Sequence, residues 1–192
     1  RAKMLTVKKV IQCCDHKEGM IPEDFEDAFT PLAKFRVGNQ IRIGIADGAT
    51  ESSFSKEWAQ LLTIQFSDHG FDLLKQEILS QLTTTWEENL NKSNLTWYNE
   101  EKFTLGSHAS FLGLEIDLQT GVYSAKAVGD CCTMLVRGGR ILNSFPVERA
   151  EDFSNHPLLV GTKNGIPAGE IRELSGNLTE GDLLILASDA FA

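Results

Sequence analysis

The stretch Ile41-Arg42-Ile43-Gly44-Ile45-Ala46-Asp47-Gly48 decides how this chain folds. Residues 41–46 have the composition of a β-strand, and the Asp-Gly dipeptide that closes the run favours a turn. We therefore expect the strand to end at Asp47, with the carboxylate of this residue at the edge of the hydrophobic core.

Other acidic residues occupy similar local positions. Asp130 and Asp189 each follow a further apolar run, and the pair Glu26-Asp27 precedes Ala28-Phe29. Carboxylates that converge at a core edge oppose one another's ionisation, a cost that a bound dication removes. Oxygen ligands select hard cations such as Mg²⁺ or Mn²⁺, and these ions activate water for the hydrolysis of a phosphate ester. The alternative is that these acids lie in ordinary turns and on the surface.

Two amphipathic helices follow the central strand. The first begins after Ser52 or Ser53, either of which can cap its first turn, and its apolar residues recur at helical spacing. The second has one apolar face, which Trp86 and Leu90 extend, and residues 89–101 are polar and predict a loop. The apolar residues are Phe54, Trp58, Leu61 and Leu62 in the first helix and Phe71, Leu74, Ile78, Leu79 and Leu82 in the second.

The rest of the chain has the residue composition that is typical of β-strands. A valine- and isoleucine-rich run predicts a first strand at 4–14, and turn signals between later runs predict an antiparallel meander. The run at 183–187 is apolar on both faces, so we expect it to be covered on two sides. This order of elements excludes a doubly wound parallel sheet and favours an α+β fold with helices packed on antiparallel sheets. The other predicted strands are 107–116, 122–128, 133–136, 140–145 and 158–161.

Composition narrows the classes of function. The chain has 192 residues, of which 42% are apolar, so we expect a single domain over residues 1–192. The net charge of −9 and the lack of a basic block disfavour nucleic-acid binding, and no apolar run is long enough for a membrane span. The pairs Cys13-Cys14 and Cys131-Cys132 lack the spacing of a zinc site and predict buried free thiols in a reducing, cytoplasmic setting.

Five motifs occur in order along the chain: Phe25-Glu26-Asp27-Ala28-Phe29, then residues 45–50, 106–112, 127–130 and 181–189. They resemble, in the same order, the N-E-D motif, the A-D-G strand end, and the G-S-T-A, G-D-S-R and G-D-x-L-L-L-A-S-D-G strands of one enzyme family. This family is the metal-dependent (PPM, type 2C) serine/threonine protein phosphatases, and the chain resembles a divergent bacterial-type member. The ordered set covers nearly the whole chain.

The resemblance implies an α-β-β-α architecture, in which a sandwich of two antiparallel β-sheets is flanked by helices on both outer faces. It also implies two ions, Mg²⁺ or Mn²⁺, in a cleft between the sheets. By matching position, Asp47 bridges the two metals and the Gly48 carbonyl ligates one of them. Asp189 ligates the other, and Asp130 matches the acid of a third, weaker site. Two further matching acids, Glu26 and Asp27, hold metal-bound waters or contact the metal directly.

The implied activity is hydrolysis of phosphoserine and phosphothreonine in a phosphorylated protein partner, with Asp27, Asp47 and Asp189 as catalytic residues. A metal-bridging hydroxide attacks phosphorus in line with the departing oxygen, while the metals neutralise the developing charge. Neither Cys131 nor Cys132 lies in the C-x5-R loop of cysteine phosphatases, so we expect both to be packing residues. The oligomeric state is not indicated.

The chain departs from the family pattern in several places. No arginine precedes the Glu-Asp pair to bind the substrate phosphate, although Lys17 offers a point charge nearby. Ala49 stands where some members have a histidine, and His108, in another motif, is expected to pack or hydrogen-bond within its strand. The final G-x-x-D-N motif has no counterpart before Ala192, which predicts truncation at the C-terminus. A catalytically silent binding or regulatory module is therefore the alternative, and a hydrolase of small phosphorylated metabolites is a third option.

Overall fold

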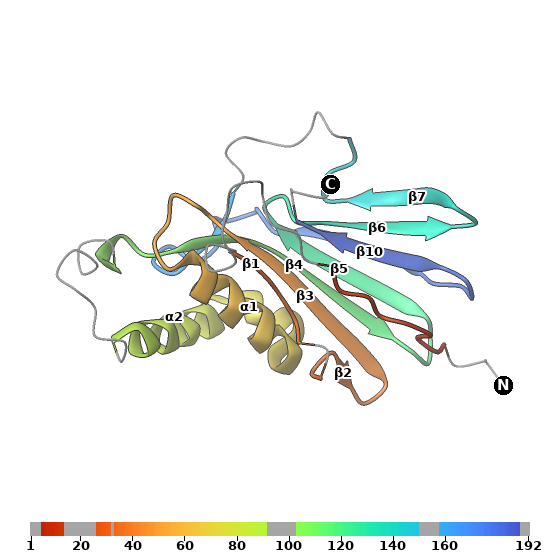
Figure 1. Ribbon diagram of the computed structural model, residues 1–192, viewed down its shortest axis with the longest axis horizontal. Helices are drawn as coiled ribbons and strands as arrows, with labels where there is room; N and C mark the ends of the chain where they lie inside the picture. The colour runs from red at the N-terminus through yellow and green to blue at the C-terminus, as the bar shows by residue number, and fades with distance from the viewer. Residues whose placement is uncertain (1–4, 14–25, 32, 92–102, 150–157, 189–192) are drawn as a thin grey trace.

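A computed structural model of the chain describes residues 5–13, 26–31, 33–91, 103–149 and 158–188. Two antiparallel β-sheets share one apolar layer, and two α-helices cover the other face of the larger sheet (Figure 1). The predicted α+β fold with two antiparallel sheets is therefore confirmed. The described residues supply helices to one of the two outer faces of the four-layer architecture.

The larger sheet has the strand order β1-β3-β4-β5-β9, with β2 paired to β3 and β8 paired to β4. The smaller sheet has the order β10-β6-β7. The strands of the larger sheet are β1 (Asp27–Phe29), β2 (Arg36–Val37), β3 (Gln40–Gly48), β4 (His108–Asp117), β5 (Val122–Val128), β8 (Val160–Gly161) and β9 (Arg172–Asn177). Those of the smaller sheet are β6 (Cys132–Arg137), β7 (Arg140–Phe145) and β10 (Leu183–Ala187).

The central strand β3 extends past its predicted end. Asp47 and Gly48 still pair with β4, opposite Ser110 and Ala109. The turn expected at the Asp-Gly dipeptide therefore begins only after Gly48, because the ladder to β4 holds both residues in the sheet. Asp47 consequently lies on a strand rather than beyond one.

Helix α1 (Ser55–His69) covers the larger sheet with one apolar face. Trp58, Leu62 and Phe66 are fully buried, in one cluster with Phe111 of β4. The indole Nε1 of Trp58 donates a hydrogen bond to the carbonyl of Val160, 2.9 Å away. The helix is thus joined to β4 by packing and to β8 by a buried hydrogen bond.

The start of α1 corrects the predicted cap. Phe54 precedes the helix in a left-handed conformation, with a φ of 62°, and no side chain caps the first turn. The hydroxyl of Ser52, one of the two predicted caps, instead lies 3.1 Å from Nδ1 of His108. A polar partner on β4 has replaced the helix amides as the partner of this hydroxyl.

The second predicted helix is divided into two parts. The first part, η2 (Gly70–Leu74), is a 3-10 helix, and α2 spans Gln76–Asn91. Trp86 and Leu90 are buried, as the apolar face predicts, but the helix continues to Asn91 where a loop was expected. Within the described residues, no helix is long and apolar enough to cross a membrane.

A second apolar cluster fills the space between the two sheets. It joins Leu112 and Leu114 of β4 to Tyr123 of β5 and Leu135 of β6. Alternate residues of a strand face opposite sides, and accordingly Phe111 of β4 belongs to the helix-side cluster. The position of a residue along β4 therefore tells which of the two layers its side chain enters.

The predicted meander is wrong in one respect. β4 pairs with β5 and β6 pairs with β7, but β5 and β6 belong to different sheets. Gly129, whose φ is 94°, lies between them. β5 instead pairs with β9, a strand that was not predicted because its sequence, Arg-Glu-Leu-Ser-Gly-Asn, has little apolar character.

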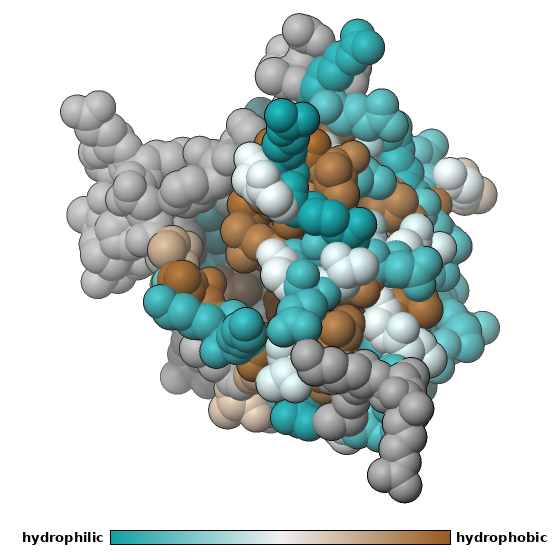
Figure 2. Space-filling model, turned by 90° about the vertical axis from the view of Figure 1, so that its right-hand side faces the viewer, coloured by the Kyte–Doolittle hydropathy of each residue, from teal (hydrophilic) through white to brown (hydrophobic). Residues whose placement is uncertain are grey.

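The prediction that residues 183–187 are covered on both faces is wrong for the described part of the protein. Leu184 and Leu186 of β10 pack on the inter-sheet cluster. Leu183 and Ile185, on the other face of the strand, are 54% and 39% exposed. Figure 2 shows hydrophobic residues interrupting the hydrophilic surface on the side of the molecule that faces the viewer.

The predicted first strand at 4–14 is also wrong over the residues described there, 5–13, which lie outside both sheets. The N–H of Leu5 donates to the carbonyl of Leu118 over 2.8 Å, and the Leu5 side chain packs on the inter-sheet cluster. Val7 and Ile11 are 41% and 67% exposed. A high β-propensity does not make a strand without a neighbouring strand to pair with.

An ion pair joins Arg137 of β6 to Asp182, the residue before β10, at one end of the smaller sheet. It leads us to expect that the stability of the protein depends on pH. Arg137 donates to both carboxylate oxygens of Asp182 over 2.7 Å, and the N–H of Thr179 donates to one of them. These hydrogen bonds, that from Arg137 above all, lower the pKa of Asp182 to about 2. Because the folded pKa lies below the unfolded one, this stabilisation is present above about pH 4 and is lost as the pH falls towards 2.

We expect the free energy of unfolding to fall more between pH 5 and pH 2 in the wild type than in Asp182→Asn. The difference should be about 1 kcal/mol, since solvent screens the half-exposed Arg137. Urea denaturation of both proteins at several pH values measures it. Parallel stability curves would show that the pair contributes nothing.

Candidate functional site

A row of three polar side chains crosses one end of the larger sheet. Asp27 of β1 is the Cα partner of Asp47 on β3, and Asp47 is the partner of Ser110 on β4. Directly opposite residues in antiparallel strands point to the same face, with Cβ atoms about 4.5–5.5 Å apart. Ile45 and Leu112, two positions along the same strands, pack in the inter-sheet cluster. The row, which we call the carboxylate row, therefore faces the space between the sheets.

Glu26 links the start of β1 to the connection between β3 and α1. Its carbonyl accepts a hydrogen bond from the N–H of Gly48 at 3.3 Å. Its carboxylate accepts one hydrogen bond from the Thr50 hydroxyl and one from the Ser55 hydroxyl, each of 2.8 Å. Gly48 must be a glycine here, because an added Cβ would lie 2.8 Å from the Ser55 backbone. Glu26 thus positions the end of β3 against the first residue of α1.

Asp130 directly precedes Cys131, a buried residue whose side chain contacts the carboxylate row. The Sγ of Cys131 is 3.0 Å from the Ser110 hydroxyl oxygen. Burial raises the pKa of Cys131 well above its ordinary value; the hydrogen bond with Ser110 acts in the opposite direction, and the charges of Asp47, Asp130 and Asp27 raise it further. Three carboxylates from separate segments therefore act on one buried thiol, and together with its burial they favour the protonated form.

The end of the smaller sheet also reaches the row. Ala187, the last residue of β10, is the Cα partner of Cys132. The hydroxyl of Ser188, the next residue, donates a hydrogen bond to Oδ2 of Asp27 over 3.1 Å. This contact joins the two sheets at the end where the acids lie. Asp189, which the sequence predicts as a metal ligand, lies outside the described residues, as does Lys17.

The structure thus brings four of the predicted residues, Glu26, Asp27, Asp47 and Gly48, into one neighbourhood, with Asp130 close by. Among the described residues, however, no three acidic, histidine or cysteine side chains meet closely enough to form a metal site by themselves. The donors of the row are carboxylate oxygens, and Mg²⁺ and Mn²⁺ prefer such oxygens. Because carboxylates directly opposite each other repel, the donor set fits a hard divalent cation.

Hydroxyl groups around the acids are the part of the site that the sequence analysis did not identify. They belong to Thr50, Ser55, Ser110 and Ser188. Serine and threonine are common in turns and at strand ends, so no local signal distinguishes them. Only the three-dimensional contacts reveal their partners.

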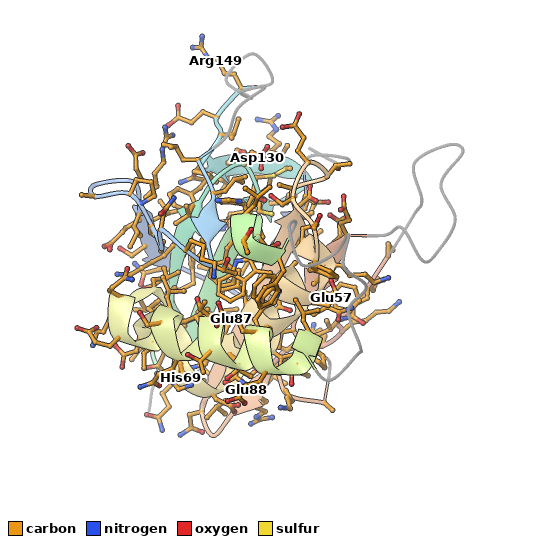
Figure 3. All side chains as sticks on the ribbon, turned by 90° about the vertical axis from the view of Figure 1, so that its left-hand side faces the viewer. Glu57, His69, Glu87, Glu88, Asp130 and Arg149 are labelled. Atoms are coloured by element: carbon orange, nitrogen blue, oxygen red, sulfur yellow. The ribbon has the colours of Figure 1, made fainter. Side chains whose placement is uncertain are left out.

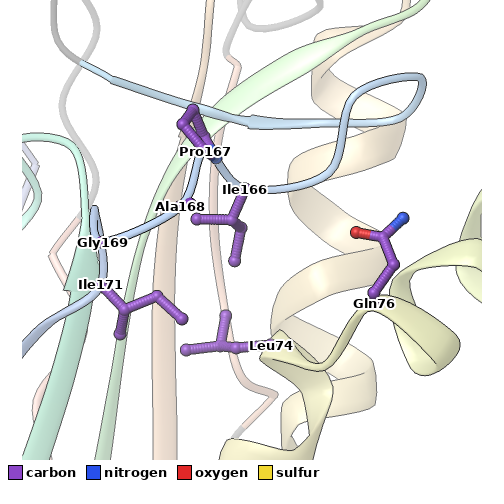
Figure 4. A pocket seen from close by; sticks show the side chains of 7 residues that line it. All are labelled: Leu74, Gln76, Ile166, Pro167, Ala168, Gly169 and Ile171. Carbon is purple, nitrogen blue, oxygen red and sulfur yellow. The ribbon is translucent and has the colours of Figure 1, made fainter.

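Other acidic residues and the described pocket lie elsewhere. Glu87 and Glu88 of α2 and His69 of α1 are well separated from Asp130 (Figure 3). A cavity of about 370 Å³ between α2 and the segment before β9 contains no ionisable side chain (Figure 4). Its lining residues are Leu74, Gln76, Ile166, Pro167, Ala168, Gly169 and Ile171. Two of these, Ile166 and Ile171, pack on the helix-side cluster, away from the face that carries the row.

Comparison with known proteins gives no match by sequence. No protein-family model matches the chain, and no curated protein matches it. Solved structures do match. The photosystem II phosphatase PBCP is 20% identical, with a TM-score of 0.54 and 86% of this chain covered. RsbX, in complex with magnesium, is 14% identical, with a TM-score of 0.57 and 92% of this chain covered.

A third matching structure is the serine/threonine phosphatase PstP/Ppp of Mycobacterium tuberculosis, which is 14% identical, with a TM-score of 0.54 and 90% of this chain covered. The chain spans 60% of the PBCP chain, 71% of the RsbX chain and 75% of the PstP chain. The chain has the fold of the type 2C (PPM) protein phosphatases.

Proposed function

We propose that this protein is a metal-dependent phosphatase of the type 2C (PPM) family that hydrolyses phosphoserine and phosphothreonine monoesters in a phosphorylated protein partner. The observation that supports it is the carboxylate row, in which Asp27 and Asp47 lie directly opposite each other on neighbouring strands. Two ionised carboxylates at this spacing repel each other, and a divalent cation between them removes the repulsion. We take residues 1–192 as a single domain of this kind.

Oxygen donors would hold two ions, Mg²⁺ or Mn²⁺, and a third ion would be bound more weakly. Glu26 would act through water, in keeping with the two hydroxyl hydrogen bonds that its carboxylate already accepts. When bound, the ions supply a water activated for attack on phosphorus and neutralise charge on the phosphoryl oxygens. The proposed ligands are Asp27, Asp47, Gly48 and Asp189, with Asp130 at the third site.

The residues around the row keep it ready for this chemistry. Ser188 orients Asp27 through its hydrogen bond, and Ser110 extends the row towards Cys131. Asp27 and Asp47 come from strands of one rigid sheet, so little reorganisation is needed when the phosphate group binds.

The requirement for metal tests this proposal. Purified protein should hydrolyse a phosphoserine or phosphothreonine peptide when Mn²⁺ is present and should lose this activity when the metal is chelated by EDTA. Phosphate release measures the activity, and the melting temperature should rise with Mn²⁺ because the ion binds only the folded state. A rate that EDTA leaves unchanged would contradict the proposal.

A catalytically silent binding module is the second candidate. It is favoured by the finding that, in the part of the chain that the structure describes, no three ligand side chains meet as a ready metal site. Calorimetric titration with Mn²⁺ distinguishes the two candidates. A silent module should take up no ion and release no phosphate, whereas the phosphatase should do both.

A reducing, cytoplasmic setting is part of the proposal. Cys13, Cys131 and Cys132 are free thiols; Cys131 and Cys132 are buried as predicted, but Cys13 is exposed, so the prediction of a buried thiol is wrong there. Disulfides are rare in the cytoplasm, where thiols stay reduced. The buried thiol of Cys131, which contacts Ser110 of the carboxylate row, is compatible with that environment.

A further inference from the structure

We propose that the edge of β9 that faces away from β5, together with the apolar cavity beside it, binds an extended segment of a partner protein. The segment adds to the larger sheet as a further strand. It carries an apolar side chain for the cavity and, two residues earlier, a basic side chain. The inference goes beyond the proposed function, because it concerns how a partner is held rather than how its phosphate is removed.

The outer edge of β9 has main-chain groups that point away from the sheet. β9 is the last strand of the larger sheet, and among the described residues no strand pairs with its outer edge. The N–H of Leu178, the residue after β9, donates to the carbonyl of Gly121. Hydrogen-bonded pairs recur at every second residue of an antiparallel ladder, so the even-numbered residues of β9 direct their main-chain groups towards β5. The N–H and C=O groups of Glu173 and Ser175 therefore point outward.

Such an edge is suited to an extended peptide. An exposed strand edge is a template on which another chain can pair, and peptides that bind in this way gain affinity from main-chain hydrogen bonds. Their specificity comes from pockets that accept alternate side chains. Because the sequence of β9 is largely polar, the edge itself offers little apolar contact area. A partner must therefore be selected by what lies beside the edge.

The apolar cavity lies at the start of this edge (Figure 4). Ile171, which directly precedes β9, forms part of its lining, together with Leu74 and Ile166. The exposed residues 167–169 form another part, so the cavity opens to solvent. Its volume of about 370 Å³ is within the range of ligand pockets and exceeds that of a leucine side chain. The cavity can therefore accept one apolar side chain of a segment paired with β9.

Contacts with η2 show that Glu173 faces the same side of the sheet as the cavity. Ile171 and Phe71 both pack on the helix-side cluster. The ammonium group of Lys126 lies 5.4 Å from the centre of the Phe71 ring and 2.5 Å from Oε1 of Glu173. Ile171 and Glu173 are two residues apart, as the alternation of side chains requires. The side chains of an added strand that enter the cavity and that contact Glu173 are therefore also two residues apart.

Glu173 supplies the charge that selects the second side chain. Its side chain is 62% exposed, and Lys126 contacts one of its two carboxylate oxygens. An ionised carboxylate can accept several hydrogen bonds, so a cation of the partner can share it. The net charge of −9 also favours a basic partner.

The direction of the added strand follows from the rest of the sheet. Every strand pair of the larger sheet is antiparallel, and we assign the same direction to the partner segment. In an antiparallel pair, the residue opposite Glu173 comes two positions before the residue opposite Ile171. A lysine or arginine, then any residue, then an apolar residue therefore defines the segment.

A synthetic peptide tests this inference directly. The probe is a fluorescein-labelled peptide of sequence Thr-Val-Thr-Lys-Thr-Leu-Thr, which should bind the wild type saturably without metal, as measured by fluorescence polarisation. Aspartate in place of its leucine should weaken binding at least about tenfold. N-methylation of its valine, lysine and leucine, whose N–H groups would face β9, should weaken binding at least about tenfold. N-methylation of the three threonines within the chain, whose N–H groups would point away, should change the Kd by less than about threefold.

Variants of the protein test the two parts of the site. Ala168→Trp places an indole at the cavity and should weaken binding at least about tenfold. Ala33→Trp, the same substitution at an exposed position in the turn before β2, is the matched control and should leave the Kd unchanged. Ser175→Pro removes one outward N–H, a change that an edge strand tolerates, and should also weaken binding. Circular dichroism and melting temperature confirm that the variants are folded.

Three results would overturn the inference. The first is that the leucine peptide does not bind the wild type saturably. The second is that its binding is insensitive to aspartate in place of leucine or to N-methylation of the residues that would face β9. The third is a dimer in sedimentation that Ser175→Pro dissociates, because a second copy of this chain would then occupy the edge. Since no metal or phosphate is present, these results are independent of whether the protein is a phosphatase.

Discussion

Replacing Asp47 with asparagine is expected to lower kcat on a phosphopeptide by about 10³-fold or more, since the loss of metal-held chemistry removes several kcal/mol of transition-state stabilisation. Asparagine keeps the size of the side chain but loses the charge that binds a dication. The backbone of β3 should be unaffected, because Asp47 pairs with β1 and β4 through main-chain atoms. Initial rates of phosphate release at saturating Mn²⁺ measure the effect.

A second readout separates loss of charge from loss of fold. Without metal, Asp47→Asn should still fold and unfold cooperatively, because asparagine keeps the shape of the side chain and lessens the repulsion between residue 47 and Asp27. The rise in melting temperature on adding Mn²⁺ should shrink or disappear. Asp68→Asn, the same substitution at an exposed position of α1, should change neither quantity. An Asp47→Asn variant that keeps full activity would remove the basis of the proposed metal centre.

Strands with clear boundary signals could be predicted closely from the sequence. The apolar runs 122–128, 140–145 and 183–187 match β5, β7 and β10 residue for residue. β5, for example, lies between Gly121 and Gly129, and both glycines have positive φ values that interrupt a strand. Residues next to each strand determined where it begins and ends, so these bounds could be predicted from the sequence alone.

The arrangement of those strands depended on contacts that no local pattern contains. β9 is largely polar and is held by its ladder to β5, about fifty residues earlier in the chain. The separation of β5 from β6 likewise follows from their partners β9 and β10. Sequence periodicity predicted strands, but it did not predict which sheet each one would join.

The candidate site was predictable in its residue types but not in its geometry. Acidic residues next to apolar runs drew attention to Asp27, Asp47 and Asp130, and the family resemblance gave their order. That Asp27 lies opposite Asp47 follows from the register of β1 on β3, which the sequence does not express. His108 was expected to pack or hydrogen-bond within its strand, but its ring contacts Ser52, which lies in the loop between β3 and α1.

Replacing Gly129 with alanine is expected to lower the free energy of unfolding by about 3–5 kcal/mol, through backbone strain and overpacking together. Gly129 follows β5 with a φ of 94°, which L side chains rarely adopt. An added Cβ would lie 2.6 Å from the Cβ of Ser110 and 2.9 Å from the carbonyl oxygen of Leu158. Because Ser110 belongs to the carboxylate row, the substitution should also lower phosphatase activity.

Gly181→Ala is the matched control, because Gly181 has a φ of 92° but an added Cβ there would meet no atom within 4 Å. Gly181→Ala therefore introduces backbone strain without overpacking, and it should lower the free energy of unfolding by about 1–2 kcal/mol. Urea denaturation measures both losses, and an unchanged m-value shows that only stability has altered. If the free energy of unfolding fell equally in the two variants, β4 would have to move aside to accommodate the new methyl group. The carboxylate row would then tolerate movement of Ser110, contrary to the rigid, preorganised site that the proposed chemistry requires.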